Sequence, residues 1–100
     1  GGTTATLLVP TYTGPAYKKV EGQPQRHGVV ILIDAYANSE IDGTRIAATD
    51  KKVWMAAEGL SVAPEPGHRL EFDGAQHAIV NVKPLAPGGV AVMYEVQARR

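Results

Sequence analysis

The stretch "RLEFDGAQHAIV", residues 69–80, decides how the chain folds, because it holds two short runs of alternating apolar and polar residues around a turn. Side chains of a β-strand alternate between two faces, so this pattern predicts two strands of a hairpin. Matching their apolar faces requires a loop with an odd number of residues, and residues 73–75 supply a three-residue loop. The apolar residues of the two strands are Leu70, Phe72, Ala78, Val80 and Val82.

The same hairpin contains a candidate metal or proton-transfer cluster of Glu71, Asp73 and His77, with His68 just ahead of it. In the predicted register His77 lies opposite Glu71 on the polar face, whereas His68 lies on the side of Leu70. The two histidines therefore cannot share a metal ion. What remains is an exposed Glu71–His77 pair, worth about 0.2 to 1 kcal/mol.

Other catalytic and ligand-binding motifs are missing from the sequence. It contains no HExxH, no paired CxxC, no EF-hand loop, no GxSxG serine and no glycine-rich phosphate loop. We therefore expect a protein that is not an enzyme, with no catalytic residues, no metal and no cofactor.

The rest of the chain repeats the pattern of the hairpin. Most apolar stretches are short, rich in Val and Ile, and closed by Gly, Pro, Asn or Asp, which is typical of strands and turns. Residues 28–36, "GVVILIDAY", hold so many consecutive apolar residues that we expect a central strand covered on both faces. Residues 44–48 and 51–58 are expected to pair as a hairpin. The remaining strands are predicted at residues 4–9, 68–73, 76–83 and 90–98.

This spacing predicts one all-β domain over residues 1–100. Six to seven mostly antiparallel strands should form a small, partly open β-barrel or a compact sandwich, with a long N-terminal loop. Short helices are expected at most in "NSEIDG" or "AAEGL".

Composition narrows the class of protein. The chain has 100 residues and no cysteine, so it can form no disulfide. Its 10 basic and 10 acidic groups balance, so the molecule as a whole has no net field that would attract nucleic acid or membrane. Charge is unevenly placed: residues 1–27 carry a net +2, residues 28–98 carry a net −4, and Arg99 and Arg100 restore zero. The longest apolar run, Val29–Ile33, is too short to span a bilayer, and no signal peptide opens the chain, so we expect a soluble intracellular protein.

The segment "TYTGPAYKKVEGQPQRH", residues 11–27, has neither strand nor helix periodicity. Long connections inside a small domain are commonly functional or disordered, so we predict a flexible functional loop over about residues 13–27, together with short flexible ends. Trp54 either caps one end of the core or is a partly exposed anchor for a partner. The candidate assembly-interface residues are Tyr12, Tyr17, Lys18, Lys19, Arg26, Trp54, Arg99 and Arg100.

Several segments together resemble a known family. They are "IDGTRI" (41–46), "PGHRL" (66–70), "IVNVKPLAPGG" (79–89) and the terminal "YEVQARR" (94–100), and "LLVPTYTGPAY" near the start is compatible with them. This order resembles the head-tail joining proteins of tailed bacteriophages and prophages, the neck or head-completion (stopper) proteins. His68 stands where the resemblance leads us to expect an aspartate.

The resemblance implies a noncatalytic virion protein, found in the host cytoplasm during assembly. It would form a ring between the portal complex and the tail and help to close the DNA-filled head, with portal or adaptor proteins and tail proteins as partners. We expect a monomer in isolation, a ring on assembly, and no membrane contact; DNA contact in the ring lumen stays open.

The residues themselves leave an alternative, a small β-barrel that binds single-stranded nucleic acid or protein. Tyr12 and Tyr17 would then stack on bases, and Lys18, Lys19 and Arg26 would contact phosphates.

Overall fold

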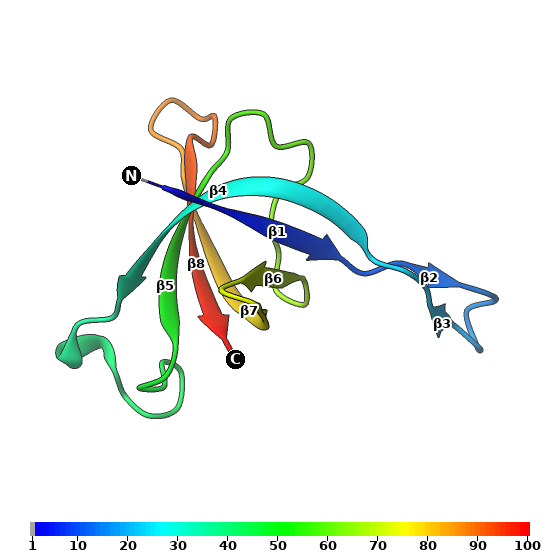
Figure 1. Cartoon of the computed structure of the whole chain (residues 1–100), viewed down its shortest axis with the longest axis horizontal. Helices are drawn as coiled ribbons and strands as arrows, with labels where there is room; N and C mark the ends of the chain where they lie inside the picture. The colour runs from blue at the N-terminus through cyan, green and yellow to red at the C-terminus, as the bar shows by residue number, and fades with distance from the viewer. Residues whose placement is uncertain (1) are drawn as a thin grey trace.

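The computed structural model describes residues 2–100, and within them six strands close an antiparallel barrel from which a short two-stranded hairpin projects (Figure 1). The order around the barrel is β1-β4-β5-β8-β7-β6. The predicted all-β fold is confirmed, and the barrel is closed rather than partly open. Among these residues no helix is long and apolar enough to cross a membrane. The elements are β1 (Thr3–Val9), β2 (Tyr12–Thr13), β3 (Val20–Glu21), β4 (Gln25–Ala35), the 3₁₀ turn η1 (Asn38–Glu40), β5 (Lys51–Ala56), β6 (Arg69–Phe72), β7 (Ala75–Leu85) and β8 (Met93–Arg99).

The core fills the inside of the barrel with alternate residues of its six strands. Leu7, Val53, Met55, Leu70 and Val96 have no exposed surface at all. Closure leaves the barrel without an unpaired edge strand, because each strand is hydrogen-bonded on both sides. The buried core comprises Ala5, Leu7, Val29, Ile31, Val53, Met55, Leu70, Phe72, Ile79, Val96 and Ala98.

The β6–β7 hairpin differs from the prediction in its turn. Asp73 and Gly74 alone form the loop, with φ angles of 52° and 72°, as a two-residue type I′ turn requires. His77 therefore lies opposite Leu70 and points into the barrel, whereas Glu71 lies opposite Gln76. The three-residue loop and the exposed Glu71–His77 pair are wrong, because the even-numbered loop exchanges the two faces of β7.

Residues 44–48 do not form the predicted strand. The segment between β4 and β5 is a loop, in which the Asp42 carboxylate accepts hydrogen bonds from the backbone N–H groups of Thr44, Arg45 and Ile46 at 2.8 to 3.0 Å. An aspartate that binds the backbone in this way favours a turn over a sheet ladder. β5 pairs instead with β4 and β8.

The run of apolar residues in β4 predicted a strand covered on both faces. In the structure only one face is covered. Val29 and Ile31 point into the core, whereas Val30 and Leu32 are 53% and 52% exposed on the outside. A barrel strand has one inner and one outer face, so a continuous apolar run leaves half of its side chains in water unless another element covers them.

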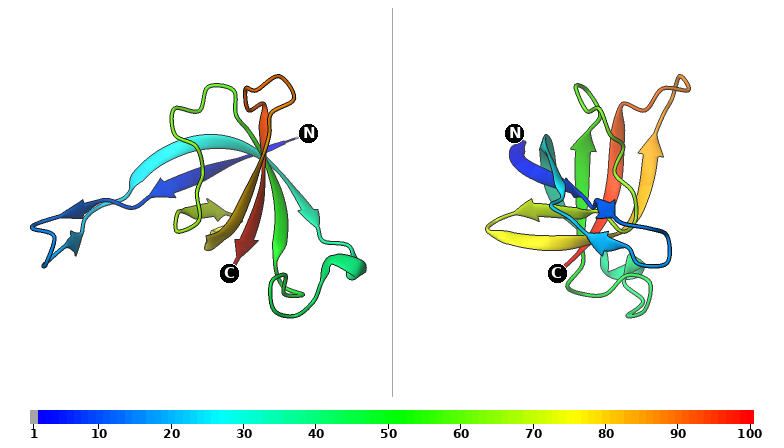
Figure 2. Two further views of the ribbon diagram at one scale, coloured as in Figure 1. Left: turned by 180° about the vertical axis from the view of Figure 1, so that it is seen from behind. Right: turned by 90° about the vertical axis from the view of Figure 1, so that its right-hand side faces the viewer.

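Residues 11–24 form a hairpin arm that projects from the barrel between β1 and β4 (Figure 2). Tyr12 pairs with Glu21 and Thr13 with Val20, and at the base the N–H of Gly22 donates to the carbonyl of Thr11 at 2.8 Å. The predicted loop is therefore shorter than residues 13–27 and is partly paired, because residues 25–27 extend β4. Its flexibility stays a prediction.

Candidate assembly surface

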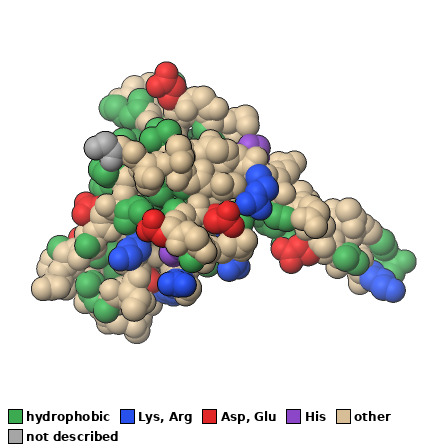
Figure 3. All heavy atoms as spheres, in the orientation of Figure 1, with side chains coloured by type: hydrophobic (Ala, Val, Ile, Leu, Met, Phe, Trp, Pro, Cys, Tyr) green, Lys and Arg blue, Asp and Glu red, His purple; other side chains and the backbone are tan. Residues whose placement is uncertain are grey.

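The arm presents apolar and basic side chains to solvent. Tyr17 is 90% exposed, Tyr12 59% and Val20 58%. Lys18 and Lys19 are exposed at the end of the arm, where the N–H of Lys18 donates to the carbonyl of Pro15 at 2.9 Å and closes the turn. Figure 3 shows apolar and basic groups side by side at this end, well away from the body of the barrel. The arm therefore exposes tyrosine, a residue type that is enriched at protein interfaces, next to two lysines.

A second apolar surface lies on the outside of β4, β5 and β8; we call Val30, Leu32, Trp54, Ala56 and Met93 the outer apolar face. The strand register places Leu32 beside Trp54 and Ala56 beside Met93. These side chains line a shallow hollow of about 180 Å³ together with Gly2 and Ile31. Trp54 is half-buried here, on the face opposite to the core, so it does not cap the core.

Acidic residues border the outer apolar face. Asp34 follows Leu32 by two positions in β4, and Glu95 follows Met93 by two positions in β8, so each carboxylate lies on the same side of its strand as the apolar residue. Glu58 is exposed in the turn after Ala56. Within residues 2–100, neither Asp34 nor Glu95 takes part in an ion pair. In the sheet register, however, Asp34 lies opposite Lys52 and Glu95 lies opposite Lys83, so lysines of the same chain flank this border.

The buried carboxylate of Asp50 fixes the loop of residues 36–50 to β8. Both oxygens of Asp50 bind Arg99, at 2.9 Å from Nε and 2.8 Å from an Nη atom, and Gln97 Nε2 donates to Asp50 at 2.7 Å. The N–H of Ala47 adds a bond of 3.0 Å. The hydrogen bonds from Arg99, followed by those from Gln97 and Ala47, lower the pKa of Asp50 from 3.8 to about 2 in spite of its burial. The second link to this loop is Gln97 Nε2, which donates to the carbonyl of Arg45 at 2.6 Å.

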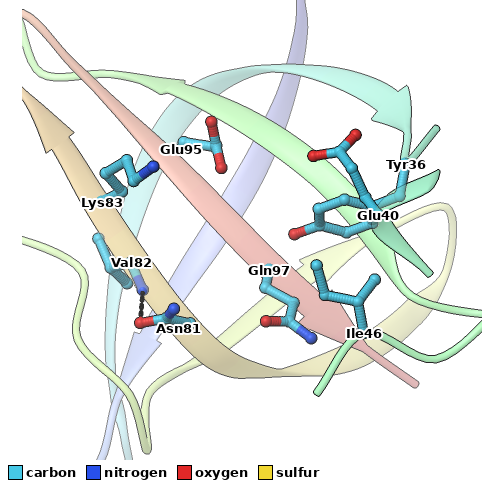
Figure 4. Close-up of a pocket in the computed structure, with 8 residues that line it drawn as sticks. All are labelled: Tyr36, Glu40, Ile46, Asn81, Val82, Lys83, Glu95 and Gln97. Atoms are coloured by element: carbon cyan, nitrogen blue, oxygen red, sulfur yellow. Dashed lines mark hydrogen bonds between the residues drawn. The ribbon is translucent and has the colours of Figure 1, made fainter. Parts of the chain in front are cut away.

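A pocket of about 210 Å³ lies where this loop meets β7 and β8 (Figure 4). Burial, and then the negative charges of Glu95, Asp50 and Glu40, raise the pKa of Tyr36 to about 12, so its hydroxyl stays protonated. Lys52 Nζ lies 5.2 Å from the centre of the Tyr36 ring and 3.4 Å from Glu40. A protonated phenol beside the paired charges of Lys52 and Glu40 can bind polar groups. The lining residues are Tyr36, Glu40, Ile46, Asn81, Val82, Lys83, Glu95 and Gln97.

At the mouth of the barrel beside Phe72, His77 is buried rather than exposed. Its ring stacks on Phe72 with centroids 3.9 Å apart and planes 5° apart, and its Nδ1 atom has no hydrogen-bond partner among the described atoms. His68 is also buried and accepts a bond from the N–H of Glu65 at 3.3 Å. The part of the chain that the structure covers contains no group of three or more His, Cys, Asp or Glu side chains placed to hold a metal ion.

The residues proposed from sequence separate into several places. Arg26 lies at the base of the arm and binds Glu71 of its own chain at 2.9 Å, and Arg99 is held by Asp50. Arg100 borders a depression of about 700 Å³ at the barrel mouth beside His77. Tyr12, Tyr17, Lys18 and Lys19 all lie on the arm, Tyr12 in its ladder and the other three at or next to its turn, while Trp54 belongs to the outer apolar face.

Sequence reasoning missed the other members of the outer apolar face, of which Val30, Leu32 and Met93 are the most exposed. The signal that was present is Asp34, which has the same strand parity as Val30 and Leu32 and marks that side of β4 as facing solvent.

Comparison with models of known protein families and with curated proteins finds no match for this chain.

Proposed function

We propose that this chain is a structural subunit of the head-tail junction of a tailed bacteriophage, where copies form a noncatalytic ring between the portal complex and the tail. The observation that carries the proposal is the arm, which exposes two tyrosines, a valine and two lysines outside a closed barrel. The biological setting comes from the resemblance in residues 41–46, 66–70, 79–89 and 94–100.

The exposed side chains of the arm support a role in assembly. Apolar groups in water are an unfavourable arrangement that burial against a partner relieves, and tyrosine contributes a large contact area with little loss of side-chain freedom. The arm is a minimal hairpin, with two residue pairs in its ladder, so it has little internal stability. It should therefore become ordered on docking to a neighbour, with its tyrosines as anchors.

The chemistry of the acidic groups supports a structural rather than a catalytic role. Asp50 is used to hold Arg99 and Gln97, and Asp42 is used to hold the backbone of its own loop. Hydrogen bonds from Ile46 and Thr44 lower the pKa of Asp42, so this carboxylate stays ionised and bound. Groups used in this way are poor proton donors or acceptors near neutral pH.

Two segments of the resemblance meet in one structural unit. Residues 41–46 contain Arg45, and residues 94–100 contain Gln97 and Arg99, whose side chains donate hydrogen bonds to the Arg45 carbonyl at 2.6 and 3.3 Å. A firmly anchored loop on a rigid barrel suits a ring subunit, whose neighbours must meet in a fixed geometry.

The test is a reversal of the two lysines at the end of the arm, Lys18→Glu with Lys19→Glu, in the phage or prophage that encodes the chain. Arg26 is left unchanged because it binds Glu71. Both lysines are exposed, so the melting temperature should stay nearly unchanged while the joining of filled heads to tails is blocked. Lys51→Glu, an exposed lysine on the barrel, is the matched control and should assemble normally. Wild-type yields of infectious particles from the double reversal would refute the proposal.

The alternative of a module that binds single-stranded nucleic acid rests on the same exposed tyrosines and lysines. It predicts salt-dependent, saturable binding of an oligothymidine, which Tyr17→Ala should weaken strongly through the loss of base stacking. Absence of binding at moderate salt would remove this alternative.

A further inference from the structure

We infer that the arm of one copy of this chain docks on the outer apolar face of a second copy, in a head-to-tail contact. The inference deepens the proposed function by naming the acceptor of the arm, and it rests on that function for its setting in a ring.

The two surfaces match in chemical character. The arm offers Tyr17, which is 90% exposed near its tip, and Val20 and Tyr12, which are more than half exposed on opposite faces of its ladder. The outer apolar face offers half-exposed Val30 and Leu32 around a shallow hollow. A hollow lined by aliphatic residues and a tryptophan accepts an aromatic ring, and such a contact removes apolar surface from water on both sides.

Charge complementarity indicates that the partner is another copy of the chain. The arm carries Lys18 and Lys19 directly after Tyr17, and its one carboxylate, Glu21, is paired with Tyr12 toward the base. The outer apolar face is bordered by Asp34, Glu58 and Glu95. Two lysines lie in register with this border, Lys52 opposite Asp34 and Lys83 opposite Glu95. Because Lys52 also lies 3.4 Å from Glu40, the border keeps an excess of negative charge. Opposite charges around an apolar centre attract the two surfaces and set their register.

The same charges disfavour symmetric pairing. Two arms brought together would place Lys18 and Lys19 against the same lysines, and two outer apolar faces would bring their acidic borders together. Like charges facing one another oppose association, so each surface repels itself and attracts the other.

The positions of the two surfaces determine what the contact builds. The arm leaves the barrel on one side, and the outer apolar face lies beside Gly2, near the chain start at the far side, as both the front and the back views show (Figures 1 and 2). Two different surfaces on different sides of one molecule make a heterologous contact, which generates a closed ring when the rotation between neighbours closes. The contact therefore provides a route from one chain to a ring.

Disulfide trapping tests the contact, because the chain has no cysteine of its own. Ala16→Cys places a thiol at the end of the arm, and Ala56→Cys places one on the outer apolar face, without removing the tyrosines, lysines or acidic residues. Oxidation of a mixture of the two variants at high protein concentration should give mainly the mixed dimer, and the double variant should give a ladder of larger oligomers. Ala48→Cys, an exposed alanine of the loop between β4 and β5, is the matched control for the acceptor.

The inference is overturned if the Ala16→Cys variant cross-links to Ala48→Cys as efficiently as to Ala56→Cys, if it mainly forms its own homodimer, or if no mixed dimer forms. A charge exchange adds a second criterion: Lys18→Glu with Lys19→Glu on the arm should abolish the cross-link, and Glu58→Lys with Glu95→Lys on the acceptor should restore it. Failure to restore it would exclude the acidic border as the recognition element.

The two proposals fail in different ways. If the lysine reversal blocks head-tail joining in the phage but no mixed dimer forms, the proposed function stands and the acceptor is wrong. If the mixed dimer forms but the reversal leaves joining intact, the contact between copies stands and the function at the head-tail junction is wrong.

Discussion

Replacing Asp50 by Asn should destabilise the barrel by an amount that follows from its hydrogen bonds. Asn is close in shape to a protonated Asp, so the substitution imitates removal of the charge without opening a cavity. Arg99, Gln97 and the N–H of Ala47 all donate to this carboxylate, and an amide accepts at only one of its two terminal atoms. The change therefore leaves buried donors without acceptors.

The magnitude comes from the pKa of Asp50, which folding lowers from 3.8 to about 2. This difference corresponds to about 2 kcal/mol of folding free energy that depends on the negative charge. A carboxyl group whose pKa is lowered in the folded state stabilises the fold above its unfolded pKa. This contribution is lost as the pH falls through the window from 3.8 to about 2.

Urea denaturation of the wild type and of Asp50→Asn at a series of pH values measures this directly. At neutral pH the variant should be less stable by about 2 kcal/mol, and the gap should narrow as the pH falls toward about 2. Asp34→Asn, an exposed carboxylate on β4, is the control and should change stability by less than about 0.5 kcal/mol.

A double-mutant cycle tests whether this loss of stability comes from the contact between Asp50 and Arg99. It compares Asp50→Asn, Arg99→Gln and the variant that carries both substitutions. The two substitutions should be strongly non-additive, because either one breaks the same bidentate contact. Equal stability of wild type and Asp50→Asn at neutral pH, or a gap that stays constant through the acid window, would show that the charge of Asp50 does not hold the loop of residues 36–50.

Two further predictions concern the β6–β7 hairpin. His77→Phe should leave the free energy of unfolding unchanged or raise it by about 1 kcal/mol, because it removes a buried nitrogen that lacks a partner while keeping a ring to stack on Phe72. A clear loss of stability in urea would show that Nδ1 has a favourable partner. Gly74→Ala should lower the free energy of unfolding by about 1 kcal/mol, because φ is 72° at this position. A Cβ atom there would meet nothing within 4 Å, so the cost comes from the backbone alone. A melting temperature equal to that of the wild type would contradict this prediction.

The positions of strands could be predicted from sequence more securely than their faces. Asp73-Gly74 is a strong signal for a two-residue turn, yet the apolar residues Val80 and Val82 favoured the opposite parity for β7. The structure explains the conflict: β7 contains a β-bulge between Ile79 and Asn81, so side chains before and after it follow different alternations. One extra residue reverses the faces, and no local pattern marks where it is inserted.

The outer apolar face and the Asp50 cluster were hidden from sequence for different reasons. In β4 both faces are apolar, so alternation carries no information until Asp34, and only the closure of the barrel decides which side is left in water. Asp50 and Arg99 are far apart in sequence, and their contact depends on β5 and β8 being neighbours. The arm, by contrast, is a local feature, and its exposed tyrosines and lysines could be proposed from composition.

The barrel closes through one short strand pairing, between β1 and β6; we call this pairing the seam. The β1–β6 pairing contains three residue pairs, the fewest of its six junctions, and it joins Leu7 to Leu70 across most of the length of the chain. Contacts so distant in sequence form late in folding, after the hairpins of neighbouring strands, and a short ladder is the first to open in the native state. Because β1 leads directly into the arm, opening of the seam leaves β1 held by β4 alone and changes the base from which the arm extends. Amide protons of β1 that face β6 should therefore exchange with solvent faster than those of β8. Docking of the arm should slow this exchange, so the exchange rates of these β1 amides would measure assembly at a site inside the barrel wall.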